Sequence, residues 1–334
     1  MTKAVISGYY GYKNFGDELI LSILINHLKE LGLEITVLSG DIEYTKKNNS
    51  VNSINRFNIR QIIKEIKNSD ILISGGGSLL QDVTSFKSLV YYSFIIALGI
   101  LYNKKVIIFA QGIGPINSNF AKTIVKNLLN NCNYISVRDE NSLKLLENWN
   151  IKSELVCDPA YSLNLKTNNE TNGVGIQLRD FSTMNYNLLQ KIAMLCISKF
   201  SDKKIKIFSL QKSKDYEICK KFQNIIKNIN PNIKTEIVET HIIDEISKLE
   251  YMIGMRFHAL LCAIKFGVKT CAINYDIKVE QLAKDAKIPI ISMNANENFE
   301  EIFQNLKNQN TENIKNFAQS KTFDWTNFDK IINK

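Results

Sequence analysis

Short apolar runs, typical of buried strands, alternate along the chain with longer runs that have the helical period. In the first half, strands are expected at residues 3–7, 34–38, 70–74, 105–110, 134–137 and 154–156. After a polar stretch at residues 166–172, the pattern resumes with strands expected at residues 174–178, 205–210, 234–238, 251–254, 269–274 and 289–291. Strands that alternate with helices form a parallel sheet covered by helices on both faces.

The two series predict an α/β protein with two Rossmann-like, doubly wound domains that face a cleft. The boundaries expected are 1–168 for an N-terminal domain, 169–318 for a C-terminal domain and 319–334 for a C-terminal helix. The longest apolar run, residues 89–102, is shorter than the roughly 20 residues of a membrane-spanning helix. We expect it to form a buried helix. The amino terminus resembles no signal peptide, so a cytoplasmic location is expected, and contact with the inner face of the membrane is left open.

The amino-acid composition limits the kinds of molecule that the protein is expected to bind. The 334 residues carry 42 Lys+Arg against 33 Asp+Glu, a formal charge of +9 that favours anionic partners. The lysines are spread singly and form no basic tail, so a nucleic-acid partner is not expected. Six cysteines are scattered without the spacing of metal ligands, which indicates a reducing compartment and no metal site.

Arginine is scarce, with five residues among the 42 basic ones, so each is expected where a planar, permanently charged group is needed. Arg138, Arg179 and Arg256 each follow the end of an expected strand, where ligands bind in open α/β sheets. They are candidates for binding an anion. The alternative for each is a helix-capping role or a surface ion pair.

Arg256 and His258 lie two residues apart in GMRFHAL, and Lys278 follows the next expected strand. Two cations and a histidine at neighbouring strand ends suit a small anion with a carboxylate or phosphate. His258 is our candidate general acid or base, whereas His27 and His241 are expected to be incidental.

Two glycine-rich loops are expected to bind a polar ligand. The first, GYYGYKNFGDE, contains Asn14 and Asp17, and the second, ISGGGSLLQD, follows the third expected strand. Backbone around consecutive glycines can approach a ligand closely, and the candidates there are Gly75, Gly76, Gly77 and Ser78. No Gly-Lys-Ser/Thr, GxGxxG or nucleophile-elbow sequence is present.

In this order and spacing, GYYGYKNFGDE, ISGGGSLLQD, AQGIGP, SVRDENS, CDPA, GIQLRD, GMRFHAL and NYDIK resemble the polysaccharide pyruvyl transferase family, and most closely its CsaB-type branch. The resemblance implies a fold like that of GT-B glycosyltransferases. It also implies phosphoenolpyruvate as donor, no further cofactor, and an N-acetylmannosamine-type sugar of a polymer or lipid-linked precursor as acceptor.

The resemblance implies that Arg138, Arg256, His258 and Lys278 bind the donor or act on it. We expect His258, Arg138 and Lys278 to be catalytic, with Arg179 and Arg256 as further donor ligands. The glycine-rich loops are expected on the acceptor side. Two alternatives remain: a glycosyltransferase that uses a nucleotide sugar, and a polysaccharide-binding protein without activity. Oligomeric state is not predicted.

Overall fold

The computed structural model describes residues 1–83, 85–163, 172–181 and 186–333, in two compact units. Unit 1 comprises Met1–Ser162 and Thr322–Lys334, and unit 2 comprises Leu163–Lys321. The last residues of the chain therefore belong to the first unit. The linker expected at residues 166–172 lies, apart from Asn172, outside the described residues.

Unit 1 contains a parallel sheet in the order β3-β2-β1-β4-β6-β7-β8, with β5 paired to β6. Its strands are β1 (Lys3–Ser7), β2 (Glu34–Ser39), β3 (Asn52–Asn55), β4 (Ile71–Ser74), β5 (Gly77–Leu80), β6 (Lys105–Ile113), β7 (Tyr134–Val137) and β8 (Glu154–Leu155). The parallel sheet was predicted, but β3 and β5 were not. The glycine-rich run does not lead directly into a helix, because β5 intervenes.

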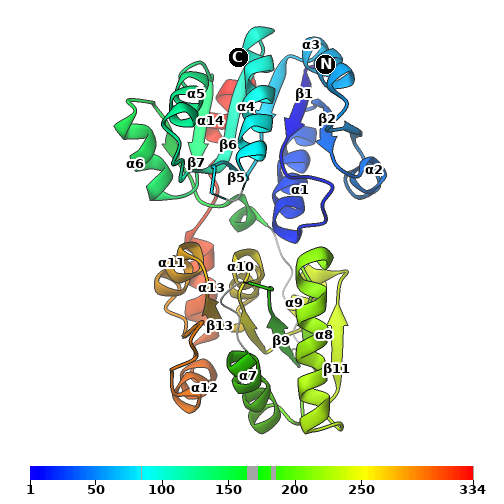
Figure 1. Ribbon diagram of the computed structural model, residues 1–334, viewed down its shortest axis with the longest axis vertical. Helices are drawn as coiled ribbons and strands as arrows, with labels where there is room; N and C mark the ends of the chain where they lie inside the picture. The colour runs from blue at the N-terminus through cyan, green and yellow to red at the C-terminus, as the bar shows by residue number, and fades with distance from the viewer. Residues whose placement is uncertain (84, 164–171, 182–185, 334) are drawn as a thin grey trace. The chain divides into compact units, whose positions relative to one another are not determined.

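Helices cover both faces of this sheet (Figure 1). They are α1 (Phe15–Glu30), α2 (Ile42–Asn49), α3 (Ile59–Asn68), α4 (Phe86–Leu101), α5 (Asn119–Leu129), α6 (Glu140–Asn148), the 3-10 helix η1 (Pro159–Ser162) and α14 (Thr326–Ile332). Buried side chains of α1 and α14 share one core, and those of α3 to α6 share the core on the opposite face.

Unit 2 contains a second parallel sheet, in the order β11-β10-β9-β12-β13-β14. Its strands are β9 (Val174–Gln177), β10 (Ile205–Phe208), β11 (Thr235–Val238), β12 (Tyr251–Gly254), β13 (Lys269–Asn274) and β14 (Ile290–Ser292). Its helices are α7 (Tyr186–Lys199), α8 (Lys212–Ile229), α9 (Ile242–Ser247), α10 (Phe257–Phe266), α11 (Ile277–Asp285), α12 (Phe299–Lys307) and α13 (Thr311–Ser320). One core lies under α7, α8 and α12, and another under α10, α11 and α13.

Both sheets are doubly wound, so each has a point where the direction of strand addition reverses. In unit 1 this point lies between β1 and β4, and in unit 2 between β9 and β12. Ligands of open α/β sheets bind at the carboxyl ends of the strands beside such a point. No helix in the described part of the chain is long and apolar enough to cross a membrane.

Candidate functional site

The cationic residues expected in unit 2 come from three adjacent strand ends at its reversal point. Arg179 follows β9, Arg256 and His258 follow β12, and Lys278 follows β13. The register pairs Gln177 with Gly254, so β9 and β12 end level with each other. The backbones of these four residues therefore lie together at the carboxyl ends of neighbouring strands, as the sequence pattern predicted.

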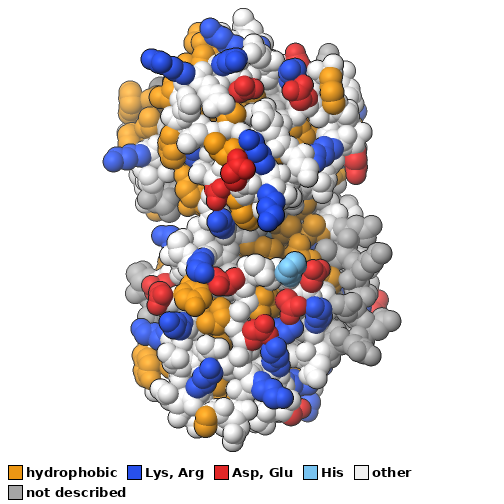
Figure 2. All heavy atoms as spheres, turned by 90° about the vertical axis from the view of Figure 1, so that its right-hand side faces the viewer, with side chains coloured by type: hydrophobic (Ala, Val, Ile, Leu, Met, Phe, Trp, Pro, Cys, Tyr) orange, Lys and Arg blue, Asp and Glu red, His pale blue; other side chains and the backbone are white. Residues whose placement is uncertain are grey.

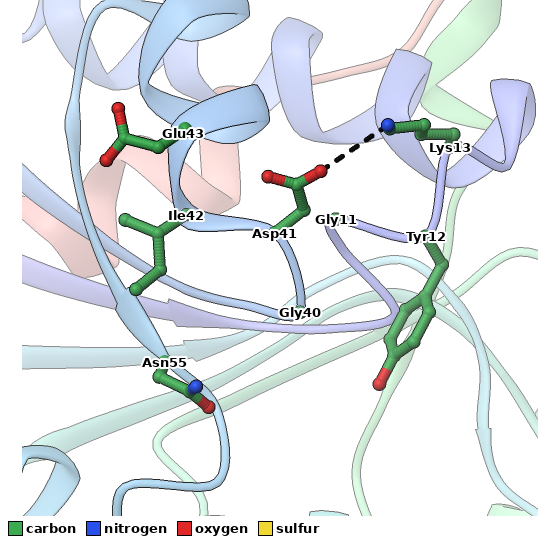
Figure 3. A pocket seen from close by; sticks show the side chains of 8 residues that line it. All are labelled: Gly11, Tyr12, Lys13, Gly40, Asp41, Ile42, Glu43 and Asn55. Carbon is green, nitrogen blue, oxygen red and sulfur yellow. Dashed lines mark ion pairs between the residues drawn. The ribbon is translucent and has the colours of Figure 1, made fainter.

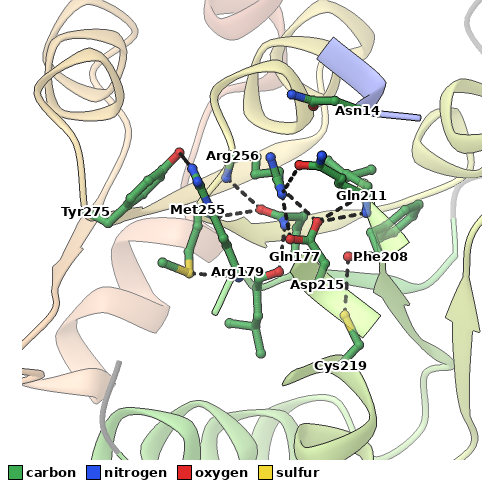
Figure 4. A network of polar contacts seen from close by, with 12 residues as sticks. Asn14, Gln177, Arg179, Phe208, Gln211, Asp215, Cys219, Met255, Arg256 and Tyr275 are labelled. Carbon is green, nitrogen blue, oxygen red and sulfur yellow. Dashed lines mark hydrogen bonds and ion pairs between the residues drawn. The ribbon is translucent and has the colours of Figure 1, made fainter. Parts of the chain in front are cut away.

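Arg256 is held by a buried aspartate (Figure 4). Its Nη2 donates to Oδ1 of Asp215 at 2.6 Å, and its Nε donates to Oδ2 at 2.9 Å. Asp215 is 0% exposed and Arg256 9%. Burial raises the pKa of the Asp215 carboxyl, and the hydrogen bond and charge of Arg256 oppose that rise. Because Nε and Nη2 of Arg256 both donate to Asp215, this edge of the guanidinium cannot also form two hydrogen bonds with a carboxylate of a ligand.

Two buried glutamines complete the support of Arg256. The side-chain carbonyl of Gln177 accepts from the backbone N–H of Arg256 at 2.6 Å, and Gln211 Oε1 accepts from Nη2 at 3.4 Å. Sequence reasoning missed Asp215, Gln177 and Gln211. A polar residue at the end of the otherwise apolar run VGIQ was the signal available for Gln177, whereas Asp215 resembles any acidic residue in the first turn of a helix.

Arg179 has a different environment. Its Nη1 donates to the hydroxyl of Tyr275 at 3.4 Å, and its guanidinium lies 5.6 Å from the centre of that ring. The buried Nε has no hydrogen-bond partner among the described residues, and no carboxylate there forms an ion pair with this arginine. A positive charge without a carboxylate partner at the reversal point is suited to binding an anion.

His258 and Lys278 occupy the first turns of their helices. His258 follows Arg256, the N-cap residue of α10, and its ring meets that of Phe257 edge to face with centres 5.2 Å apart. The backbone N–H of Lys278 donates to Oδ1 of Asp276, the N-cap residue of α11. Capping of this kind fixes the start of α11, and with it the backbone of Lys278.

In unit 1, Arg138 is also paired with a buried aspartate. Its Nη1 donates to Oδ2 of Asp158 at 2.7 Å, and the two side chains are 11% and 3% exposed. The other carboxylate oxygen of Asp158 accepts from the backbone N–H of Ala160. The CDPA segment therefore orients Arg138, a role that its sequence did not indicate. The arginines expected to bind the donor thus fall into two classes: Arg138 and Arg256 with aspartate partners, and Arg179 without one in the described chain.

The glycine-rich run at the reversal point of unit 1 is closely packed. A Cβ on Gly75 would lie 1.9 Å from the hydroxyl of buried Tyr10, and one on Gly76 would lie 2.7 Å from Ile20. Only Gly77 of the three has a positive φ, 104°. Packing against Tyr10 and Ile20 therefore accounts for glycine at the first two positions, which were expected to approach a ligand.

Among the residues expected on the acceptor side, Asp17 lies beside both Asn14 and Gly77. Nδ2 of Asn14 donates to Oδ2 of Asp17 at 2.5 Å, and a Cβ on Gly77 would lie 3.0 Å from Oδ1 of Asp17. Ser78 is partly buried at the start of β5. Asp17 therefore borders the glycine run, and the acceptor-binding role of all six residues, Gly75 and Gly76 included, stays a prediction.

An open pocket of about 630 Å³ lies beside this loop, at the carboxyl ends of the first strands of unit 1 (Figure 3). Its lining includes Tyr12, Asn55, and an ion pair in which Nζ of Lys13 lies 3.4 Å from Asp41. Behind its wall, Oε1 of Glu18 accepts from the backbone N–H groups of Gly11 at 2.8 Å and Lys13 at 3.3 Å. Glu18 thus fixes the loop that forms the pocket wall.

The carboxyl of Glu18 should make the stability of unit 1 depend on pH. Burial raises the pKa of Glu18 from 4.5 to about 7, against the lowering effect of the Gly11 N–H. The folded chain then keeps a proton that the unfolded chain has lost, so stability falls between about pH 4.5 and 7, by roughly 3 kcal/mol. Glu18→Gln keeps an acceptor for the loop and removes the titration. Its melting temperature should match the wild type near pH 4.5 and exceed it at pH 8.

Glu245→Gln is the control with the opposite sign. Hydrogen bonds from Lys206 and Lys248 lower the pKa of Glu245 to about 2. That carboxylate stabilises the fold above about pH 4.5 and loses its effect as pH falls toward 2. Glu245→Gln should therefore be less stable than the wild type at pH 8. A constant difference between Glu18→Gln and wild type from pH 5 to 8 would contradict the burial argument.

No group of three or more His, Cys, Asp or Glu side chains with the arrangement of a metal site occurs in the residues that the structure describes.

Comparisons with known proteins show the family and the fold class of the chain. A family model described as polysaccharide pyruvyl transferase matches residues 14–277. No curated protein sequence matches the chain.

Solved structures with the GT-B fold are similar over the whole chain. A putative UDP-N-acetylglucosamine 2-epimerase from Listeria monocytogenes has a TM-score of 0.65 and 7% identity, covering 95% of this chain and 90% of its own. A glycosyltransferase from Rickettsia africae has a TM-score of 0.64 and 14% identity, covering 99% and 98%. HepE of Anabaena, in complex with UDP-glucose, has a TM-score of 0.62 and 9% identity, covering 100% and 99%. These matches confirm the predicted fold class.

Proposed function

The chain belongs to the polysaccharide pyruvyl transferase family, and we propose that it transfers pyruvate from phosphoenolpyruvate to an N-acetylmannosamine-type sugar, as the CsaB-type branch does. The acceptor is a cell-wall polysaccharide or its lipid-linked precursor. The products are a pyruvate ketal and free phosphate. The observation that supports this most is the row of Arg179, Arg256, His258 and Lys278 at the reversal point of unit 2.

The reaction adds two hydroxyls of one sugar to the same carbon. The methylene carbon of phosphoenolpyruvate takes up a proton and becomes a methyl group, and one hydroxyl attacks the adjacent carbon. The carbon–oxygen bond to phosphate then breaks, phosphate leaves with its electron pair, and the second hydroxyl closes the ketal. One of the two hydroxyl protons balances the proton gained by carbon, and the other is released with phosphate.

The residues divide this work by their chemistry. His258 exchanges protons with the acceptor hydroxyl or the donor, because an imidazole can give and take a proton near neutral pH. Arg179, without a carboxylate partner in the described chain, and Lys278 neutralise the anionic groups of the donor. Arg256 and Arg138 are fixed by Asp215 and Asp158, so they contribute oriented N–H groups more than net charge.

Phosphate release tests the assignment directly. With a synthetic β-linked N-acetylmannosamine disaccharide, we expect phosphate from phosphoenolpyruvate only when enzyme and acceptor are both present. The ketal should appear in the product as one added pyruvate by mass spectrometry. UDP-sugars should transfer nothing.

The similarity to HepE with UDP-glucose favours one rival, a nucleotide-sugar glycosyltransferase on the same fold. Saturable binding of a nucleoside diphosphate together with no turnover of phosphoenolpyruvate would establish that rival and reject the proposed reaction. Sugar binding without any phosphate release would instead indicate a non-catalytic polysaccharide-binding protein.

A further inference from the structure

Helix α4 exposes an apolar stripe to solvent. Sequence periodicity predicted a buried helix at residues 89–102, and that prediction is wrong for one face. Phe86, Val90, Phe94 and Leu101 are exposed, and their spacing places them on one side of the helix, with half-buried Ala97 between the last two. The opposite side of α4 is buried in the core of unit 1. A helix that is apolar on both sides needs a second apolar or amphipathic partner.

The stripe is part of a wider surface formed by α3, α4 and α5, which we name the α3–α5 surface. In Figure 1, α4 lies between α3 and α5. Exposed apolar side chains also occur at both neighbours: Phe57 just before α3, Ile59 at its first position, and Phe120 and Ile124 on α5. Isolated exposed hydrophobic residues are ordinary, but exposed apolar side chains on three helices that pack side by side indicate an interaction site.

The same three helices are strongly basic. They carry six basic residues and one acidic residue, Glu65; the basic ones are Arg60, Lys64, Lys67, Lys87, Lys122 and Lys126. The whole chain has 42 basic residues and 33 acidic ones, a net charge of +9, and these three helices supply five of those nine charges. None of the six forms an ion pair with a carboxylate in the described chain. Figure 2 views unit 1 from the right-hand side of Figure 1, so that α5 faces away, and shows hydrophobic, basic and acidic side chains at that surface.

We propose that the α3–α5 surface docks the protein on an anionic lipid bilayer, with the apolar stripe of α4 entering the headgroup region and the surrounding basic side chains contacting lipid phosphates. Apolar side chains flanked by Lys and Arg are the features of a surface-binding helix. A second copy of the chain fits less well, because a two-fold interface would place two basic surfaces against each other. This inference does not rest on the proposed reaction.

Vesicle co-sedimentation tests the docking surface. The probes are vesicles of phosphatidylcholine alone and vesicles of phosphatidylcholine with phosphatidylglycerol in equal parts. Wild-type protein should bind the anionic vesicles, bind more weakly at high salt, and not bind the neutral ones. Val90→Ser/Phe94→Ser should bind the anionic vesicles at least about tenfold more weakly, because two apolar groups no longer enter the bilayer.

The matched control is Met194→Ser/Ile229→Ser, in unit 2. Those side chains are 52% and 46% exposed, close to the 50% and 39% of Val90 and Phe94. The control should bind like the wild type. A second variant, Lys64→Gln/Lys87→Gln, leaves the apolar stripe intact and should weaken binding to anionic vesicles by roughly fivefold per lysine.

Three results would overturn the proposal: no binding of wild-type protein to anionic vesicles, equal binding by Val90→Ser/Phe94→Ser, or a wild-type dimer that this variant dissociates. An assay of phosphate release with a soluble acceptor tests the proposed reaction independently of membrane docking. Val90→Ser/Phe94→Ser should release phosphate at the wild-type rate. Vesicle binding without any phosphate release would reject the reaction and leave the docking surface standing.

Discussion

Replacement of His258 by alanine is expected to lower phosphate release from phosphoenolpyruvate by about 10²- to 10⁴-fold. The position at the start of α10, beside the reversal point of unit 2, brings the backbone of His258 to the same end of the sheet as the cationic residues. No other histidine follows β9, β12 or β13 in the described chain. If His258 transfers the proton, its loss should reduce kcat while affinity for phosphoenolpyruvate changes by only a few fold.

His241→Ala is the control for this variant. His241 is the N-cap residue of α9 in the same unit, and its side chain is 79% exposed. It should keep wild-type activity. Unchanged phosphate release by His258→Ala would remove this residue from the mechanism and direct attention to the carboxylates of unit 1.

The two parallel sheets could be predicted from the sequence because their central strands are buried on both faces and therefore read as continuous apolar runs. Strand β3 was not predicted because it lacks such an apolar run. It is the edge strand of its sheet, and its sequence NSIN buries only its two central residues. Strand β5 escaped because Gly77 and Ser78 carry no hydrophobic signal. The exposed face of α4 was missed because periodicity measures hydrophobicity and says nothing of what covers each side.

The candidate cations could be found from the scarcity of arginine and from positions after strands, but their partners could not. Asp158 lies 20 residues from Arg138, and Asp215 lies 41 residues from Arg256. Neither separation follows a local period, so only the fold brings each pair together. The distinction between Arg179, which has no carboxylate partner among the described residues, and Arg256, which has one, therefore emerged only from the structure.

The loss of Asp215 should be among the most destabilising single substitutions in unit 2. Asp215→Ala leaves the Arg256 guanidinium, whose side chain is 11% exposed, without its carboxylate. It also leaves the backbone N–H groups of Leu210 and Gln211 without the acceptor that they now share. Removing one partner of a buried ion pair costs about 3–5 kcal/mol, because the remaining charge stays desolvated. Urea unfolding monitored for unit 2 should show that loss.

Glu236→Ala is the matched control, since it removes a carboxylate that pairs with Lys204 at the surface of the same unit, where the two side chains are 48% and 49% exposed. Its cost should be about 1 kcal/mol or less. The double variant Asp215→Ala/Arg256→Leu should recover much of the stability lost in Asp215→Ala, because no buried charge remains unpaired. It should not recover activity, since Arg256 itself is gone. Equal destabilisation by Asp215→Ala and Glu236→Ala would mean that Asp215 does not hold Arg256 in place, and the division between oriented and charged arginines would fail with it.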